Sequence, residues 1–157
     1  MEYGCSIGIM TSFLANSNQH VFGIDRSFSA ISVAKKTPKD NLDYFVADLM
    51  SNVFGKTKFD LILALNVLEL VEPKDLLKYI SQQIPKGHFV ISDPYDFDRG
   101  KNSVKKPLDE LTLRTSLEEL GFTIFVKTKK PSYLTWNLKL NSRSTLNYKV
   151  DLIIAKK

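Results

Sequence analysis

The stretch EYGCSIG at residues 2–8 decides the fold. Glycines that follow a strand end let the backbone turn sharply and come close to a ligand. We expect a helix to begin near Gly8 and to continue to residue 15, with its free N–H groups facing that ligand. The spacing differs from the Gly-x-Gly-x-x-Gly pattern of dinucleotide-binding turns, because Ser6 and Ile9 occupy the second and third glycine positions. Taken alone, the stretch is also compatible with an ordinary tight turn.

Short apolar runs alternate with helical patterns after this turn, which indicates βαβ units and a mostly parallel sheet. The strand predicted over residues 59–65 is apolar almost throughout, as is typical of a central strand covered on both faces. Residues 97–106 are polar and basic and predict a loop. The other elements predicted before residue 121 are strands over 21–25, 44–48 and 88–92 and helices over 30–36, 73–84 and 107–120.

The end of the chain departs from this alternation. Strands are predicted over residues 122–127 and 149–155, and a long hairpin connection with some strand content joins them. A terminal antiparallel pair inserts a reversed strand into the sheet. We therefore predict a Rossmann-like, three-layer αβα fold with a mostly parallel sheet and a C-terminal antiparallel strand pair, in a single domain over residues 1–157.

Two aspartates lie at the ends of successive strands after the glycine turn. Asp25 lies about twenty residues on, where a carboxylate can accept two hydrogen bonds from a ribose diol. Asp48 precedes Leu49, so its carboxylate can accept an exocyclic amine while an apolar neighbour packs on a purine. Ligands of open α/β sheets bind at the carboxyl ends of strands, so the pair indicates a nucleotide-type site. Either aspartate alone is better explained by a helix cap or a solvated turn.

Together these segments resemble the class I S-adenosylmethionine-dependent methyltransferases over nearly the whole chain. The motifs are individually loose, and the resemblance lies in their order and spacing. The matching segments are EYGCSIG (2–8), GID (23–25), ADL (47–49), FDLILALNVLE (59–69), PKGHFVIS (85–92) and LEELGF (117–122). The resemblance implies a methyl-transferring enzyme with S-adenosylmethionine as its cofactor.

The resemblance also implies which residues bind the cofactor. It places the glycine loop against the methionine part, the acidic residue of the second motif on the ribose and the third motif at the adenine. The residues expected to bind the cofactor are Glu2, Gly4, Cys5, Gly8, Asp25, Arg26, Asp48, Leu49 and Asn66.

The chain departs from the family pattern in three places. Ser6 stands where the middle glycine is usual, a variant that a small side chain should tolerate. The sequence starts at Met1, directly before Glu2, so the first, central strand is expected to be truncated and to leave unpaired inner edges in the sheet. Residues 131–147 match no general part of the family.

Methyl transfer can proceed by positioning and desolvation, and it needs a general base only when the acceptor loses a proton. The sequence therefore assigns no catalytic residue. The loops after the fourth and fifth strands offer Glu69, Asp93 and Tyr95 as residues that contact the acceptor. Each of them is slightly better explained by a turn or a helix start.

The composition is that of an ordinary globular protein, with 43% hydrophobic and 25% charged residues. Cys5 is the single cysteine, so an intramolecular disulfide is excluded, and a nearby helix N-terminus could acidify its thiol if it does not simply pack. His20 and His88 have no further metal ligands near them in sequence, so no metal is expected. The lack of a long apolar run and of a signal-peptide pattern predicts a cytoplasmic protein without a membrane partner.

The charge is unevenly distributed. Residues 1–100 hold 10 basic and 12 acidic side chains, whereas residues 101–157 hold 12 basic and 5 acidic ones. This basic surplus could attract a nucleic acid such as RNA, or it forms a solvated lysine-rich surface. Trp136 and Tyr133 could stack on a base or pack within the hairpin.

Three functions remain open from the sequence. The leading one is S-adenosylmethionine-dependent methyl transfer to a small molecule, an RNA or a protein. A second is an NAD(P)-dependent oxidoreductase, for which Arg26 after Asp25 would suggest a phosphorylated ribose. A third is a degenerate methyltransferase-like module that binds a partner without catalysis. The oligomeric state is not predicted.

Overall fold

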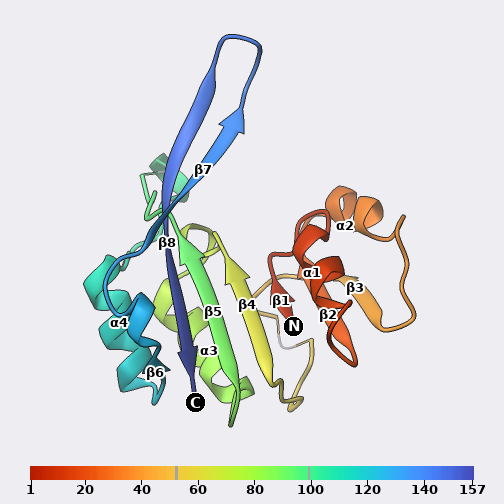
Figure 1. Cartoon of the computed structure of the whole chain (residues 1–157), viewed down its shortest axis with the longest axis horizontal. Coiled ribbons are helices and arrows are strands. Elements are labelled where there is room, and N and C mark those ends of the chain that lie inside the picture. Colours follow the sequence, from red (N-terminus) through yellow and green to blue (C-terminus); the bar gives the residue numbers. More distant parts are fainter. Residues whose placement is uncertain (52, 99) are drawn as a thin grey trace.

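Eight strands form one mixed sheet in the computed structural model, which describes residues 1–51, 53–98 and 100–157. The strands are β1 (Glu2–Tyr3), β2 (Val21–Asp25), β3 (Leu42–Val46), β4 (Leu61–Leu65), β5 (His88–Asp93), β6 (Thr123–Ile124), β7 (Tyr133–Lys139) and β8 (Thr145–Lys156). Their order is β3-β2-β1-β4-β5-β8-β6, with β7 paired to β8 outside this path. The strands from β1 to β5 are parallel, and β8 is antiparallel to β5, β6 and β7. The predicted Rossmann-like fold is confirmed (Figure 1).

Helices cover both faces of this sheet. They are α1 (Ile9–Leu14), α2 (Phe28–Ala34), α3 (Pro73–Gln83) and α4 (Glu110–Glu119), with 3-10 turns η1 (Leu68–Leu70), η2 (Gly100–Asn102) and η3 (Val126–Thr128). Side chains along a strand alternate between faces. In β2, Val21 accordingly packs with residues of α1 and α2, whereas Ile24 belongs to the cluster that α3 and α4 cover. The result is the predicted three-layer arrangement.

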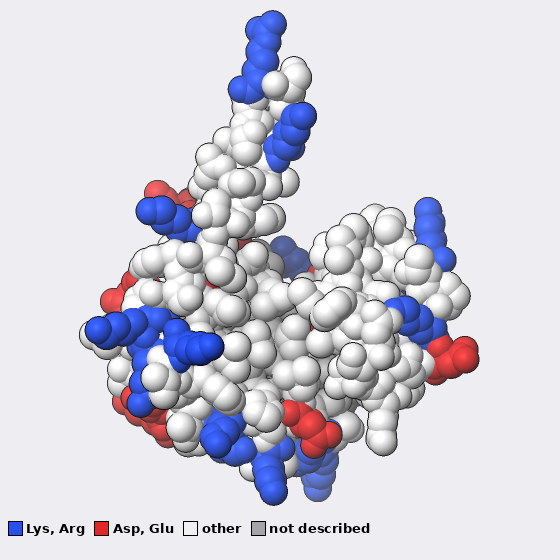
Figure 2. Space-filling model, viewed as in Figure 1, with Lys and Arg blue, Asp and Glu red and all other residues white. Residues whose placement is uncertain are grey.

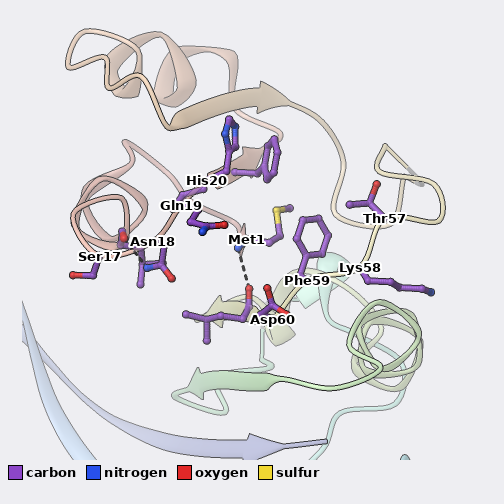
Figure 3. A pocket seen from close by; sticks show the side chains of 13 residues that line it. Met1, Ser17, Asn18, Gln19, His20, Thr57, Lys58, Phe59 and Asp60 are labelled. Atoms are coloured by element: carbon purple, nitrogen blue, oxygen red, sulfur yellow. Dashed lines mark hydrogen bonds between the residues drawn. The ribbon is translucent and has the colours of Figure 1, made fainter.

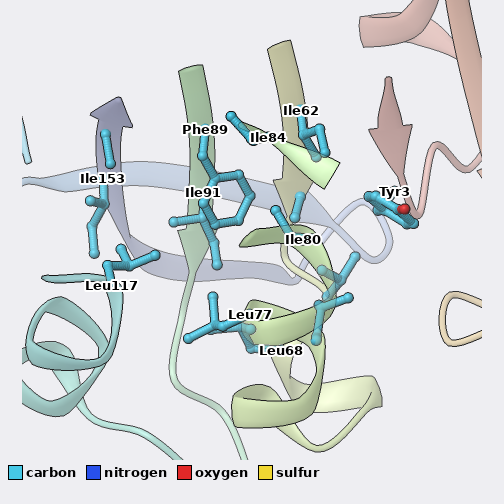
Figure 4. Close-up of a cluster of buried hydrophobic side chains, with 14 of the residues drawn as sticks. Tyr3, Ile62, Leu68, Leu77, Ile80, Ile84, Phe89, Ile91, Leu117 and Ile153 are labelled. Carbon is cyan, nitrogen blue, oxygen red and sulfur yellow. The ribbon is translucent and has the colours of Figure 1, made fainter. Parts of the chain in front are cut away.

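The larger core lies between the sheet and the pair α3 and α4 (Figure 4). Leu77 and Ile80 of α3, Ile84 at its end, and Phe89 and Ile91 of β5 are each at most 1% exposed. Burying a side chain of this size stabilises the fold by about 1.5–3 kcal/mol. This cluster therefore fixes β4 and β5, whose carboxyl ends carry one side of the candidate site.

Helix α4 begins three residues later than predicted. The Asp109 carboxylate accepts the backbone N–H of Thr112 at 2.7 Å, and the Thr112 hydroxyl accepts the N–H of Asp109 at 2.9 Å. This reciprocal cap sets the start of the helix at Glu110. Gly121 ends the helix with a φ of 85°, as predicted. In the loop predicted over 97–106, residue 99 lies outside the described residues.

The central strand β1 has two residues, Glu2 and Tyr3. It still pairs on both sides, because Glu2 is aligned with Gly23 of β2 and with Leu63 of β4. Flanking backbone bonds extend this pairing: the Leu63 N–H donates to Met1 O, and the Cys5 N–H donates to a β2 carbonyl, both at 2.9 Å. The expectation of unpaired inner edges is therefore wrong along β1, because this short strand pairs with both β2 and β4.

The C-terminal strands differ from the prediction in length. The strand predicted over 122–127 ends at Ile124. The Phe125 N–H still donates to Ile154 O at 2.9 Å, but Phe125 O accepts the Thr128 N–H, and the Ile154 N–H donates to the Thr128 hydroxyl at 3.1 Å, so the chain turns into η3. Strand β8 pairs with β5 and β6 in its second half and with β7 in its first half. The predicted hairpin connection is thus a two-stranded ribbon, the β7–β8 ribbon (residues 133–150), which projects beyond the ends of β4 and β5 (Figure 1).

A buried ion pair holds the root of this ribbon. Arg114 of α4 donates to both carboxylate oxygens of Asp151 at 2.7 and 3.0 Å, and the two side chains are 7% and 0% exposed. The Tyr95 hydroxyl and the Ser132 N–H donate to the same carboxylate at 2.7 and 2.9 Å. Burial opposes ionisation of Asp151, but these hydrogen bonds outweigh it and lower its pKa. The group joins α4, β8 and the segment after β5.

Replacing Arg114 with Met leaves the Asp151 carboxylate buried without its cation. We expect the free energy of unfolding, measured by urea denaturation, to fall by about 3–5 kcal/mol. Arg143→Met removes an exposed arginine and serves as the control, with a change below about 0.5 kcal/mol. A loss at Arg114 no larger than at Arg143 would contradict the role of the pair.

Candidate functional site

Five of the predicted cofactor residues line one cavity at the carboxyl edge of the sheet. The lining residues are Gly4, Asp25, Arg26, Asp48, Leu49, Leu70 and Val71. The strand order reverses at β1, which lies between β2 and β4, and ligands of open α/β sheets bind at such switch points. Leu70 and Val71 were not predicted, because an apolar residue after a strand looks the same in sequence whether it lines a cavity or a core.

The glycine loop between β1 and α1 requires left-handed backbone at three positions. The φ angles are 71° at Gly4, 49° at Ser6 and 80° at Gly8. A Cβ added at Gly4 would collide with the Val67 side chain, and one at Gly8 would collide with the Tyr44 ring. The Tyr44 hydroxyl also donates to Gly8 O at 3.0 Å. Packing alone therefore requires both glycines, and their contact with a ligand stays a prediction.

Asp25 connects this loop to the start of α2. Its Oδ2 accepts the Ser6 N–H at 2.9 Å, and its Oδ1 accepts the Ser27 N–H at 2.8 Å. The side chain is half-buried, and each carboxylate oxygen has a further lone pair. Both oxygens can therefore still accept hydrogen bonds from the two hydroxyls of a diol. Arg26, next to it, is exposed at the same cavity.

Asp48 and Leu49 place a carboxylate beside an apolar surface. Asp48 is exposed, and its Oδ1 accepts the Met50 N–H at 2.8 Å, which holds the turn after β3. Leu49 is 6% exposed and belongs to the larger core. Asn66 follows β4 with a φ of 55°, and its Oδ1 accepts the Ser92 hydroxyl at 3.2 Å. The pair Asp48–Leu49 lines the cavity, whereas Asn66 is not among its lining residues.

Glu2 and Cys5 face the protein interior. Glu2 is 4% exposed and accepts a hydrogen bond from the Thr11 hydroxyl, yet burial raises its pKa to about 7. Cys5 is also buried, and burial raises the pKa of its thiol to about 12. The carboxylates of Glu2 and Asp25 raise this pKa further, which argues against the option of an acidified thiol. Contact of Glu2 or Cys5 with a cofactor stays a prediction.

The acceptor-side candidates lie beyond β4 and β5. Asp93 is 1% exposed and accepts the N–H groups of Leu68 and Tyr95 at 3.2 and 2.8 Å. The Tyr95 hydroxyl donates to Asp151. The pKa of Tyr95 is raised, mainly by burial and next by this hydrogen bond. Glu69 lies on η1 and is 8% exposed. The structure gives Asp93 and Tyr95 hydrogen bonds within the protein, and contact of all three with an acceptor remains untested.

Residues 1–91 match the family described as the methyltransferase domain. The chain belongs to this family. In sequence it is 32% identical over 101 residues to the mitochondrial ubiquinone biosynthesis O-methyltransferase of Schizosaccharomyces pombe. The match covers 59% of this chain and 36% of that protein, so the chain spans about a third of the length of this relative.

Solved structures share the fold of this methyltransferase domain. An S-adenosylmethionine-dependent methyltransferase from Mesorhizobium loti superposes with a TM-score of 0.72 at 20% identity, covering 99% of this chain and 89% of that one. Magnesium protoporphyrin IX methyltransferase from Synechocystis PCC 6803, crystallised with bound S-adenosylmethionine, gives a TM-score of 0.68 at 18% identity, with coverage of 99% and 68%. At these identities the likeness is one of fold.

A second cavity of the methyltransferase domain lies at the opposite edge of the sheet (Figure 3). Its volume is about 420 Å³, and its lining includes Met1, His20, Phe22, Phe59 and Asp60. It lies at the amino ends of β2 and β4, beside the start of the two-residue β1. Because cofactors of open α/β sheets bind at the carboxyl ends, we place the candidate site of this domain at the cavity beside Asp25.

The lengths of the helices and the contacts of the hairpin aromatic residues concern the partners that were predicted for the chain. Across the described ranges, no helix has the length and apolar content needed to cross a bilayer. Trp136 stacks on Tyr148 with 5.2 Å between the ring centroids, so packing within the hairpin is confirmed. The Tyr133 hydroxyl donates to Glu110 at 2.5 Å. Stacking of Trp136 on a nucleic-acid base stays a prediction.

Ser6→Gly should stabilise the protein. A left-handed backbone costs a residue with a Cβ about 1–2 kcal/mol, and the greater freedom of glycine in the unfolded chain offsets part of the relief. We expect the free energy of unfolding to rise by about 0.5–1 kcal/mol in urea denaturation. In the control, Ser32→Gly within α2, it should fall by a similar amount. Destabilisation at both positions would rule out strain at Ser6.

Glu2 should make stability decrease with rising pH. Its pKa is about 7 in the folded chain and 4.5 for an unperturbed glutamate, so between these values the folded state holds a proton that the unfolded state has released. Relative to Glu2→Gln, which stays neutral, the wild-type free energy of unfolding should fall by about 3 kcal/mol from pH 4.5 to pH 7. Denaturation at several pH values measures this difference, and exposed Glu118→Gln should show none.

Proposed function

We propose that this chain binds S-adenosylmethionine at the cavity beside Gly4 and Asp25 and transfers its methyl group to an acceptor oxygen. The observation that carries the proposal is the convergence of three loops, those after β1, β2 and β3, on one cavity at the switch point of a methyltransferase-domain fold. The five predicted residues in this lining come from positions 4 to 49, and folding brings them together.

The side chains fit the parts of this cofactor. Asp25 presents two half-buried oxygens for the ribose hydroxyls, and the glycine loop offers its backbone to the methionine part. Asp48 accepts the exocyclic amine of the adenine, and Leu49 supplies an apolar wall. When bound, the cofactor supplies a methyl group activated by the positive charge on its sulfur. The protein then has to orient the acceptor and exclude water.

The S. pombe relative, named as an O-methyltransferase, supports an oxygen as the acceptor atom. A hydroxyl that becomes methylated must lose its proton, to water or to a side chain. Glu69, Asp93 and Tyr95 stay predictions for contacts on the acceptor side. A transfer assay with several acceptor classes determines the chemical class of the acceptor.

Asp25→Ala should weaken cofactor binding by about tenfold or more, because it removes hydrogen bonds to a charged group. The measurement is a calorimetric titration with S-adenosylhomocysteine, the demethylated cofactor. Asp60→Ala removes an exposed aspartate at the amino end of β4 and should leave the affinity unchanged. Thermal melts of both variants separate lost binding from lost folding. Equal affinities in the two folded variants would exclude Asp25 from the site.

Two further arms test the alternatives. Tighter binding of NAD or NADP than of S-adenosylhomocysteine would replace the proposal with the oxidoreductase. Methyl-labelled S-adenosylmethionine is then offered with phenols, with amines, with RNA and with protein as acceptors. Label on the oxygen of a phenol supports the proposal. Binding without transfer to any of these acceptors would favour a non-catalytic module.

A further inference from the structure

The β7–β8 ribbon has one apolar face and one polar face. Residues 134, 136 and 138 of β7 are Leu, Trp and Leu, and they lie opposite Val150, Tyr148 and Leu146 of β8. Because side chains alternate along a strand, these six residues share one face. The other face carries Thr135, Asn137 and Lys139 opposite Lys149, Asn147 and Thr145. The ribbon is therefore amphipathic, although its sequence has no long apolar run.

The apolar face lies open to solvent over most of its length. All seven residues of β7 are exposed. The exposed fractions are 53% for Leu134, 44% for Trp136, 41% for Leu138 and 39% for Leu146, and Leu140 in the turn is 59% exposed. A two-stranded ribbon is only marginally stable in water without a surface to pack on. Clustered exposed apolar side chains of this kind mark an interaction site.

The charge of the ribbon is of one sign. Residues 133–150 contain Lys139, Arg143 and Lys149 and no Asp or Glu. The two lysines lie on the polar face, and Arg143 lies in the turn between the strands. Figure 2 shows blue basic groups on the projecting part of the molecule and no red groups on its outer half. A partner that approaches the ribbon therefore meets three cations and no acid.

We propose that the β7–β8 ribbon docks the protein on an anionic lipid surface. The leucines and Trp136 enter the boundary between headgroups and acyl chains, while Lys139 and Lys149 extend their long side chains to the headgroups from the other face. Trp and Tyr side chains favour this boundary, because one part of the ring is apolar and another part forms hydrogen bonds. Anionic headgroups supply the negative charge that the ribbon lacks.

Charge and shape favour this occupant over two others. A second copy packed on the same face would bury the apolar side chains but would leave the cations of both ribbons without an acid from either ribbon to pair with them. A nucleic acid would satisfy the cations, but its bases stack on aromatic rings and gain little from leucines, which are the commonest residue on this face. The proposal differs from the expectation that the chain has no membrane partner, an expectation that stays untested. That expectation rested on run length, which an alternating strand pattern does not show.

Vesicle binding can be followed without a label, because Trp136 is the single tryptophan in the sequence. Vesicles of equal parts phosphatidylcholine and phosphatidylglycerol should shift its emission to shorter wavelength and should sediment the protein. Vesicles of phosphatidylcholine alone should do neither at the same lipid concentration. Added salt should weaken the binding, because it screens the attraction between headgroups and lysines.

Two pairs of variants assign this binding to the ribbon. The triple change K139Q/R143Q/K149Q should lower the vesicle partition coefficient on the order of 100-fold, since each cation near an anionic surface contributes about fivefold. The control K74Q/K78Q/K86Q removes three exposed lysines elsewhere and should change it less than twofold. L138S/L140S should abolish the emission shift, whereas V33S/V126S, two exposed valines outside the ribbon, should keep it. Thermal melts of all four variants test whether they fold.

Four outcomes would overturn the docking proposal. They are the absence of binding to anionic vesicles at low salt, equal binding to phosphatidylcholine alone, equal losses in the variants and their controls, and an emission shift that depends on protein concentration without lipid. The last outcome would indicate a second copy as the occupant. Binding of single-stranded RNA without binding of anionic vesicles would assign the ribbon to nucleic acid instead.

Discussion

The pairing of the two-residue strand β1 with both of its neighbours holds the sheet together. On one side lie β2 and β3 with α1 and α2, and on the other lie β4, β5 and β8 with α3 and α4. So short a strand forms few backbone hydrogen bonds, and its side chains add to them. Glu2 is bonded to Thr11 of α1, and Tyr3, which is 1% exposed, is bonded to Gln83 of α3. Each residue of β1 thus ties the strand to a different helical layer.

This constraint also determines where the candidate site lies. The glycine loop begins at the residue after β1, so the position of the strand fixes the loop beside the ends of β2 and β3. Asp25 then bonds the loop at Ser6 and the start of α2 at Ser27. The carboxylate proposed for the ribose is therefore already held by the backbone before any ligand arrives. Positioning a binding group in advance lowers the ordering cost of binding.

The sequence predicts the parts of the fold that depend on local pattern. The parallel strands, the turn at Gly121 and the aspartates after β2 and β3 are visible because apolar runs and turn residues mark them. Features that depend on distant partners are not visible. The start of α4 depends on a side-chain cap, the end of β6 on the Thr128 hydroxyl, and the high pKa of Cys5 on burial. The amphipathic ribbon could not be predicted for a related reason, because its apolar face forms when β7 and β8 pair.

The hydrogen bonds around Asp151 make the ribbon an arm that is fixed at one end and projects into solvent at the other. Its root is clamped from three directions, by Arg114, Tyr95 and Ser132, at a position that is 1% exposed. From Val150 to the turn, the cross-strand pairs of the described residues resist bending. Thermal motion should therefore grow from the root to the turn, with the body of the protein left still. These hydrogen bonds include that of Tyr95, which lies two residues after the end of β5. A force on the turn of the ribbon is therefore transmitted to the carboxyl edge of the sheet, where the candidate cofactor site lies.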